Sequence, residues 1–128
     1  MPHFTVAYWC VLAAALLPVF CSAAAKRGRK DFDNHAPREW LSRLDGWRAR
    51  AAAAQGNGFE NLPFFIGAVV IAHQLGAPQG RVDLLAVAWV LTRIVYSLLY
   101  IANRPSLRSA AYTVGLLLNV AILFAGYR

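Results

Sequence analysis

Residues 90–109 read VLTRIVYSLLYIANRPSLRS, which places Arg93 inside the longest apolar part of the chain. A cation within a membrane-spanning helix is costly unless it faces the protein interior and finds a partner. We therefore expect Arg93 to face other helices and to serve a site. Asn57 and Glu60 lie at the start of another apolar segment, and we expect them to serve a site for the same reason.

The composition is typical of a polytopic membrane protein. Of the 128 residues, 59% are hydrophobic and only 15% are charged. Soluble domains average about 45–50% apolar and about 25% charged residues. The apolar excess falls into four blocks, and a soluble core of this size would not need four such segments. The sequence therefore predicts an all-α fold, an integral membrane four-helix bundle that forms a single domain, residues 1–128.

Four helices are expected at about residues 3–25, 47–75, 82–103 and 107–127, with a long polar loop at residues 26–46. Short connections make the last three helices antiparallel neighbours. For the first segment a cleaved secretory signal peptide is an alternative, because small residues precede the basic cluster. The absence of Lys and Arg before the apolar run favours a retained helix, since signal peptides begin with a basic region.

The net charge of +7 is concentrated in one part of the chain, because eight of the thirteen Lys and Arg residues lie in residues 26–50. Basic loops beside membrane helices commonly set the topology and contact anionic membrane lipid, so nucleic acid is not an expected partner. Arg104 and Arg108 would lie on the same side as this loop, and only Arg81 and Arg128 on the other. By the positive-inside rule, residues 26–46 form a cytoplasmic loop and both termini lie on the non-cytoplasmic side.

The two cysteines give no sign of a disulfide or a metal site. Cys10 and Cys21 fall on one predicted helix, eleven residues apart. That separation corresponds to roughly 16 Å along a helix, too far for a disulfide between them. No Cys or His spacing is typical of a metal site, so we expect both cysteines to be packing residues.

Polar residues recur at helical spacing on three of the expected helices. Residues three, four and seven apart share a helix face, so three polar stripes can converge on one pocket near the cytoplasmic end. Arg pairs with carboxylates, Glu accepts an ammonium group, and Arg with Ser can stabilise a thiolate. Such a pocket suits an anionic, amino-bearing, peptide-like ligand. The three stripes are Arg50, Asn57 and Glu60; Arg93, Tyr96 and Tyr100; and Arg108, Ser109 and Tyr112.

Simpler structural interpretations of these residues remain open. Arg93 and Glu60 can form a buried ion pair that joins two helices, which would leave Arg108, Asn57 and the tyrosines unexplained. The tyrosines can also be core or membrane-interface aromatics, as Trp and Tyr commonly are.

The chain carries four motifs, one at the end of the first expected helix and one on each of the other three: KRGRK (26–30), NGFENLP (57–63), RIVYSLLY (93–100) and RSAAY (108–112). In this order they resemble the MAPEG family, membrane-associated proteins in eicosanoid and glutathione metabolism, and in particular its small bacterial members. The resemblance covers nearly the whole chain.

The resemblance implies a four-helix subunit that assembles as a homotrimer in the bacterial inner (cell) membrane. Glutathione, as co-substrate, would bind between subunits near the cytoplasmic face. Arg108, with Ser109, would stabilise the glutathione thiolate, and Arg27 would reach in from a neighbouring subunit. Arg93 would be a core charge tied to Glu60 or to the ligand. The residues implied to bind glutathione are Arg27, Asn57, Glu60, Arg93, Tyr96, Tyr100 and Tyr112, together with Ser109.

The resemblance leads us to expect an enzyme, a membrane-bound glutathione transferase or peroxidase that acts on a hydrophobic small molecule, an electrophile or a lipid hydroperoxide. Many catalytic members carry Arg immediately before the second-helix Asn, where this chain has Gly56, and often His at the position of Tyr96. Arg50, on the same face as Asn57, is a candidate replacement for the missing Arg.

Two alternatives to the enzyme are considered. The missing Arg motivates the first, a non-catalytic MAPEG-like protein that binds lipid or a partner protein. The second, a small transporter or channel, fits the intramembrane charge, but one Arg–Glu pair without a repeated acidic ring makes a poor ion pathway.

Overall fold

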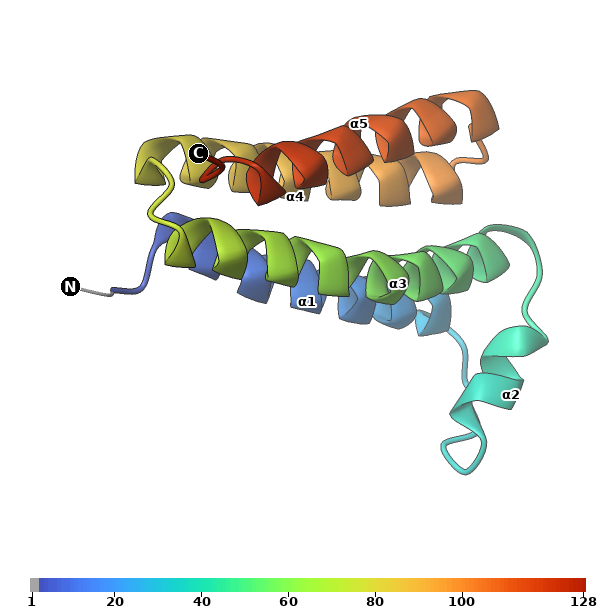
Figure 1. Ribbon diagram of the computed structural model, residues 1–128. Coiled ribbons are helices and arrows are strands. Elements are labelled where there is room, and N and C mark those ends of the chain that lie inside the picture. The colour runs from blue at the N-terminus through green and yellow to red at the C-terminus, as the bar shows by residue number, and fades with distance from the viewer. Residues whose placement is uncertain (1–2) are drawn as a thin grey trace.

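The computed structural model describes residues 3–128, a range that contains five helices and no strand (Figure 1). Four of the helices are long. The helices are α1 (Val6–Lys26), α2 (Pro37–Ser42), α3 (Gly46–Gln74), α4 (Gln79–Ile101) and α5 (Pro105–Leu123).

Helix α3 packs against each of the other long helices. It contacts α1, α4 and α5, while α4 contacts both α1 and α5. Figure 1 shows α1 on one side of α3 and the pair α4 and α5 on the other, with the start of α1 and the end of α5 at the same end of the molecule. The order of the helices along the chain makes each long helix run opposite to the one before it.

Three helices in the described range, α1, α4 and α5, are long and apolar enough to cross a membrane. Helix α3 is the longest, but polar Asn57, Glu60 and Asn61 interrupt its apolar part. Of the four spanning helices expected, three therefore meet the requirement by length and composition alone.

The core lies between α1, α3, α4 and α5 and is built mostly from small and apolar residues. Phe65 of α3 stacks on Trp89 of α4, with ring centroids 4.0 Å apart and planes inclined by 6°. Gly58 allows α3 to approach α1 closely, because a Cβ at this position would lie 2.7 Å from Cγ of Pro18. Ile122 brings α5 into the same core.

Both ends of α1 are fastened by side chains from other helices. The first N–H groups and the last carbonyls of a helix have no partner within the helix, and they carry partial positive and negative charge respectively. At its start, Asp83 Oδ1 accepts a hydrogen bond of 2.9 Å from the Ala7 N–H. At its end, Arg48 Nη1 donates to the Ala25 carbonyl at 3.0 Å and also to the Arg27 carbonyl. Charges of the favourable sign therefore hold α1 at each end.

Local sequence signals set the ends of the helices. The Thr5 hydroxyl accepts a hydrogen bond of 3.1 Å from the Tyr8 N–H, so α1 begins at Val6 rather than at residue 3. Asn103, with a φ of 59°, stops α4, because Asn tolerates the left-handed conformation better than most residues. The last helix was expected to reach residue 127, but it ends at Leu123.

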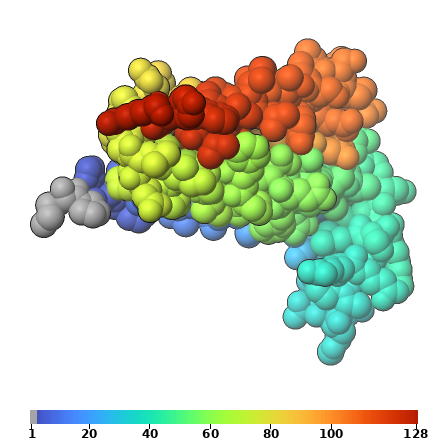
Figure 2. Space-filling model, in the orientation of Figure 1, coloured from blue at the N-terminus to red at the C-terminus, as the bar shows by residue number. Residues whose placement is uncertain are grey.

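The segment expected to be a polar loop, residues 26–46, contains the short helix α2. Pro37 occupies the first position of this helix, where its missing N–H costs nothing. Trp40 is buried against Phe32, with ring centroids 5.0 Å apart. Figures 1 and 2 show this segment as a lobe that projects from one end of the helices. Helix α2 was not predicted because it is only six residues long and lies in a charged segment, where a single aromatic contact gives no apolar periodicity.

Candidate functional site

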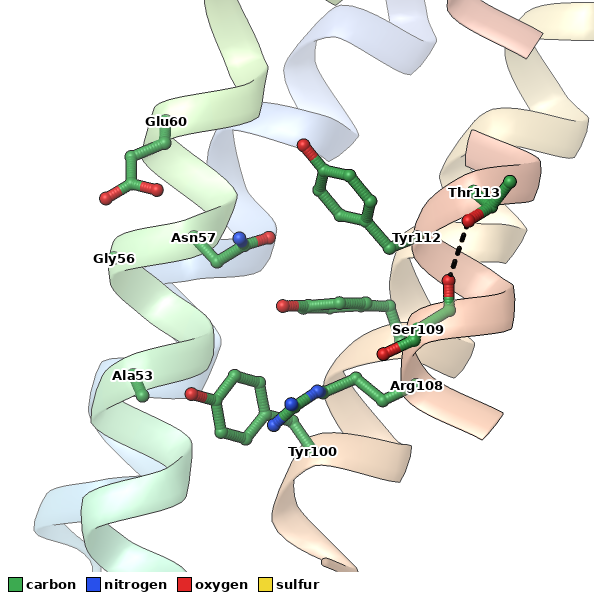
Figure 3. A pocket seen from close by; sticks show the side chains of 10 residues that line it. Ala53, Gly56, Asn57, Glu60, Tyr100, Arg108, Ser109, Tyr112 and Thr113 are labelled. Atoms are coloured by element: carbon green, nitrogen blue, oxygen red, sulfur yellow. Dashed lines mark hydrogen bonds between the residues drawn. The ribbon is translucent and has the colours of Figure 1, made fainter. Parts of the chain in front are cut away.

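A cavity of about 580 Å³ lies between α3, α4 and α5 (Figure 3). Small-molecule sites in proteins commonly have volumes of about 300–1,000 Å³, so the cavity is large enough for a ligand. It gathers side chains from all three of the polar stripes expected from the sequence. The lining residues are Ala53, Gly56, Asn57, Glu60, Tyr96, Tyr100, Arg108, Ser109, Tyr112 and Thr113.

Helices α4 and α5 supply an aromatic and basic wall. The Arg108 guanidinium lies over the Tyr100 ring, 4.3 Å from its centroid, which orients the cation without an ion pair. The Tyr96 ring lies between Tyr100 and Tyr112, with centroids 5.9 and 6.2 Å away. Ser109 stands on the first turns of α5, where its carbonyl accepts a hydrogen bond of 3.0 Å from Thr113 (Figure 3).

Helix α3 supplies the opposite wall, in which Asn57 and Glu60 differ in direction. Figure 3 shows the Asn57 side chain directed from α3 toward the side of α4 and α5, and the Glu60 carboxylate directed away from that side. Three residues advance a helix by about 300°, so these two side chains are separated by about 60° around α3. Glu60 consequently lies at the exposed rim of the cavity.

The ion pair between Arg93 and Glu60, one of the interpretations left open by the sequence, is wrong. Arg93 is only 4% exposed, and its Nη2 donates a hydrogen bond of 2.6 Å to Asn57 Oδ1. Its guanidinium also lies over the Tyr96 ring, 4.1 Å from the centroid. The ion pairs found within residues 3–128, Arg29–Asp31 and Arg43–Glu39, do not involve Arg93. Arg93 therefore lies behind the wall of the cavity, because the turn of α3 brings Asn57 toward it and carries Glu60 past it.

Two other arginines that were considered for ligand binding do not line the cavity of their own subunit. Arg50 Nε donates a hydrogen bond of 3.0 Å to the Ile101 carbonyl at the end of α4, so it does not replace the Arg missing at Gly56. Arg27 is exposed at the end of α1 and does not line the cavity of its own subunit.

Ala53 and Thr113 also line the cavity, although their residue types did not predict it. Ala53 lies four residues before Asn57, and Thr113 four residues after Ser109. Same-face spacing predicts both positions, but a small apolar side chain and a threonine give no chemical signal of their own. Among residues 3–128, no group of three His, Cys, Asp or Glu side chains is placed to hold a metal ion.

The apolar helices and the polar cavity toward one end of them define a helical membrane protein with a small-molecule-sized site. The model of the MAPEG family matches residues 6–127, nearly the whole chain, and the protein belongs to this family. The resemblance inferred from the four motifs is thus confirmed. No match was found among curated proteins or among solved structures.

Proposed function

We propose that this protein is a membrane-bound, glutathione-dependent enzyme, a transferase or peroxidase that acts on hydrophobic electrophiles or lipid hydroperoxides. One observation carries the proposal: Arg108 and Ser109 share a single open cavity with Asn57 and three tyrosines. A cationic and hydroxyl-bearing wall lowers the free energy of a thiolate, which is the reactive form of a thiol. Membership of the MAPEG family supports the assignment.

The chemistry assigns each polar group a role. Arg108 stabilises the thiolate by charge, and the Ser109 hydroxyl donates a hydrogen bond to it. In conjugation, the thiol gives up its proton and the sulfur forms a bond to an electrophilic carbon of the substrate, while a leaving group such as halide departs with the electron pair of the broken bond. In peroxide reduction, two glutathione thiols are oxidised to a disulfide while the hydroperoxide becomes an alcohol and water. Substrates dissolved in the membrane reach the cavity from the lipid, since two of the three helices around it, α4 and α5, are apolar enough to span the bilayer.

The proposal includes a homotrimer of four-helix bundles, with glutathione held between subunits. Glu60 is exposed on α3 beside apolar Phe59 and Phe64. A carboxylate facing lipid would be costly, so cover from a neighbouring subunit is favourable at this face. Such a neighbour would also bring an Arg27 to the cavity, which the subunit's own Arg27 does not line.

The proposed orientation places the cavity near the cytoplasmic face of a bacterial inner membrane. The basic segment 26–50 and Arg104 lie at the cavity end of the helices. Basic residues mark the cytoplasmic side, so both termini would lie on the opposite side.

A second candidate is a non-catalytic member of the family that binds lipid or a partner protein. Gly56 favours it, because this cavity position holds no cation and a Cβ there would meet no atom within 4 Å. The cavity would then lack one Arg that many catalytic members carry.

The test is calorimetric titration of glutathione into the detergent-purified protein, wild type beside Arg108→Ala. The matched control is Arg104→Ala, which removes an exposed arginine four residues away that does not line the cavity. We expect the wild type and Arg104→Ala to bind alike and Arg108→Ala to lose at least about tenfold in affinity. Turnover of an aryl halide with glutathione should show the same order. A folded wild type that neither binds glutathione nor turns over the halide would favour the non-catalytic candidate.

A further inference from the structure

Arg93 does not line the cavity, yet it contacts two residues that do. It donates a hydrogen bond of 2.6 Å to Asn57, and its guanidinium lies over the ring of Tyr96. It is only 4% exposed, so a ligand in the cavity has no direct access to it. Any effect of Arg93 on a ligand must pass through these two neighbours.

The hydrogen bonds to Asn57 fix which way its amide points. Its Oδ1 accepts one hydrogen bond from Arg93 and a second, of 3.1 Å, from Asn61 Nδ2. Asn61 is itself held, because the same Nδ2 donates to the Asn57 carbonyl at 2.8 Å. An amide oxygen has two lone pairs, so both are occupied. What Asn57 can still offer to a ligand is the Nδ2 amino group, for which no acceptor is found within residues 3–128.

The charge on Arg93 is not neutralised by an acidic side chain of the described range, where neither ion pair includes it. Electrostatic interactions are stronger in the interior than in water, and hydrogen bonds in series polarise one another. The Asn57 amino group is therefore a stronger donor than an amide without a cation behind it. A ligand group that accepts its hydrogen bond and carries negative charge gains from both effects.

We propose that Arg93 is a positioning residue that locks Asn57 as a hydrogen-bond donor toward the cavity, where it selects an anionic acceptor group, such as a carboxylate, on the ligand. The identity of that ligand as glutathione rests on the proposed function. The orientation of Asn57 does not, and it can be tested without any ligand.

The decisive variant is Asn57→Asp, which keeps the shape of the side chain but has only acceptors. Its carboxylate can still receive the hydrogen bonds of Arg93 and Asn61, and it adds an ion pair with Arg93. We expect a Tm equal to or above that of the wild type. We also expect at least about a tenfold loss of glutathione affinity, because a donor to an anionic group is replaced by a second anion. Asn34→Asp, in the exposed loop, is the matched control for added charge and should change neither quantity.

A thermal double-mutant cycle with Arg93→Gln tests the contact itself. The Tm of Asn57→Asp should fall steeply when Arg93→Gln is added, by more than Arg93→Gln lowers the Tm of the wild type. Additive changes in Tm, or unchanged glutathione affinity in Asn57→Asp, would overturn the proposal. If the wild type does not bind glutathione, the proposed function fails. The cycle then decides alone: coupling supports the positioning role of Arg93, and additivity overturns it.

Discussion

Two regions on either side of α3 contain similar kinds of residue but differ in how they are filled. The seam between α1, α3 and α4 holds Arg93, Ser97 and Cys21, and leaves a cavity of only about 10 Å³. The gap between α3, α4 and α5 holds Arg108, Ser109 and three tyrosines, and leaves about 580 Å³. A volume near 10 Å³ is at the limit for one water molecule. Polar residues in the seam therefore support structure, and those in the gap are available to a ligand.

The difference begins with two glycines in one turn of α3. Gly58 faces the seam, where a Cβ would lie 2.7 Å from Pro18, so its lack of a side chain lets α1 and α3 touch. Gly56 faces the gap, where a Cβ would meet nothing within 4 Å. The same residue type thus closes one region and leaves room in the other.

The largest effect is expected from Gly58→Ala, which breaks the seam. The Pro18 ring is rigid, so α1 must move away from α3, and overpacking of this kind costs about 1–3 kcal/mol. Ala gains about 1 kcal/mol over Gly in helix propensity, which offsets only part of that cost. A lower Tm, measured by circular dichroism in detergent, is the expected result.

Gly56→Ala is the matched control, with the same chemical change in the open gap. It should raise the Tm slightly through helix propensity. Equal losses of Tm in the two variants would show that the seam and the gap do not differ in packing as described.

A smaller effect is expected from Asp83→Ala, which releases the start of α1 from the seam. Asp83 accepts hydrogen bonds from the Ala7 N–H and from Gln79 Nε2, at 2.9 and 2.6 Å. Loss of an acceptor at a helix start costs about 1 kcal/mol, and Asp83→Asn, which keeps one oxygen, should lose less. Glutathione affinity should not change in either variant, because the cavity lies at the other end of α3. A loss of affinity that equals that of Arg108→Ala would contradict the separation of the two regions.

Helical spacing was sufficient to predict the gap but not the seam. Asn57, Tyr100, Arg108 and Tyr112 all line the cavity as their three-, four- and seven-residue spacing indicated. Spacing defines which residues share a face, and a cavity wall is one face of a helix. It does not define which of two neighbouring positions on that face meets a given partner, and α3 turns Asn57 rather than Glu60 toward Arg93. For that reason the ion pair of Arg93 with Glu60 was wrong.

Helical spacing also could not predict the partners of the two arginines at the start of α3. Arg48 and Arg50 are two residues apart and point to different neighbours, the end of α1 and the end of α4. Their acceptors are main-chain carbonyls, which every residue has, so no pattern of side chains could reveal them. The pairing became visible only once the ends of the helices were placed in space.

Gly56→Arg tests whether the gap binds an anionic ligand. It adds the cation that many catalytic family members carry next to the Asn. The new side chain has space, since no atom lies within 4 Å of the position of its Cβ. We expect glutathione affinity to rise two- to fivefold, roughly 0.4–1 kcal/mol, as for a partly solvated ion pair. Gly56→Met, a straight side chain without charge, is the control. A gain in both variants would assign the effect to helix stability rather than to charge.

The smallest effect is expected outside both regions, in the loop that carries α2. The Arg29 guanidinium donates two hydrogen bonds to Asp31, at 2.9 and 2.7 Å, and holds the pKa of that carboxyl below its usual value. A carboxyl with a lowered pKa in the folded state stabilises the fold above its unfolded pKa of about 3.9. That stabilisation is lost as the pH falls through the lowered folded pKa. Both partners are exposed, so solvent screens the pair.

Asp31→Asn should therefore lower the Tm at pH 7 by less than any variant of the seam, and should remove a small part of the Tm loss below pH 4. Thermal melts of both proteins from pH 7 to pH 3, at low and high salt, measure this difference. Salt should reduce it, because the pair lies in water. A change as large as that of Gly58→Ala would mean that the loop is packed against the helices of the seam, and that the projecting lobe belongs to the closed region of the molecule.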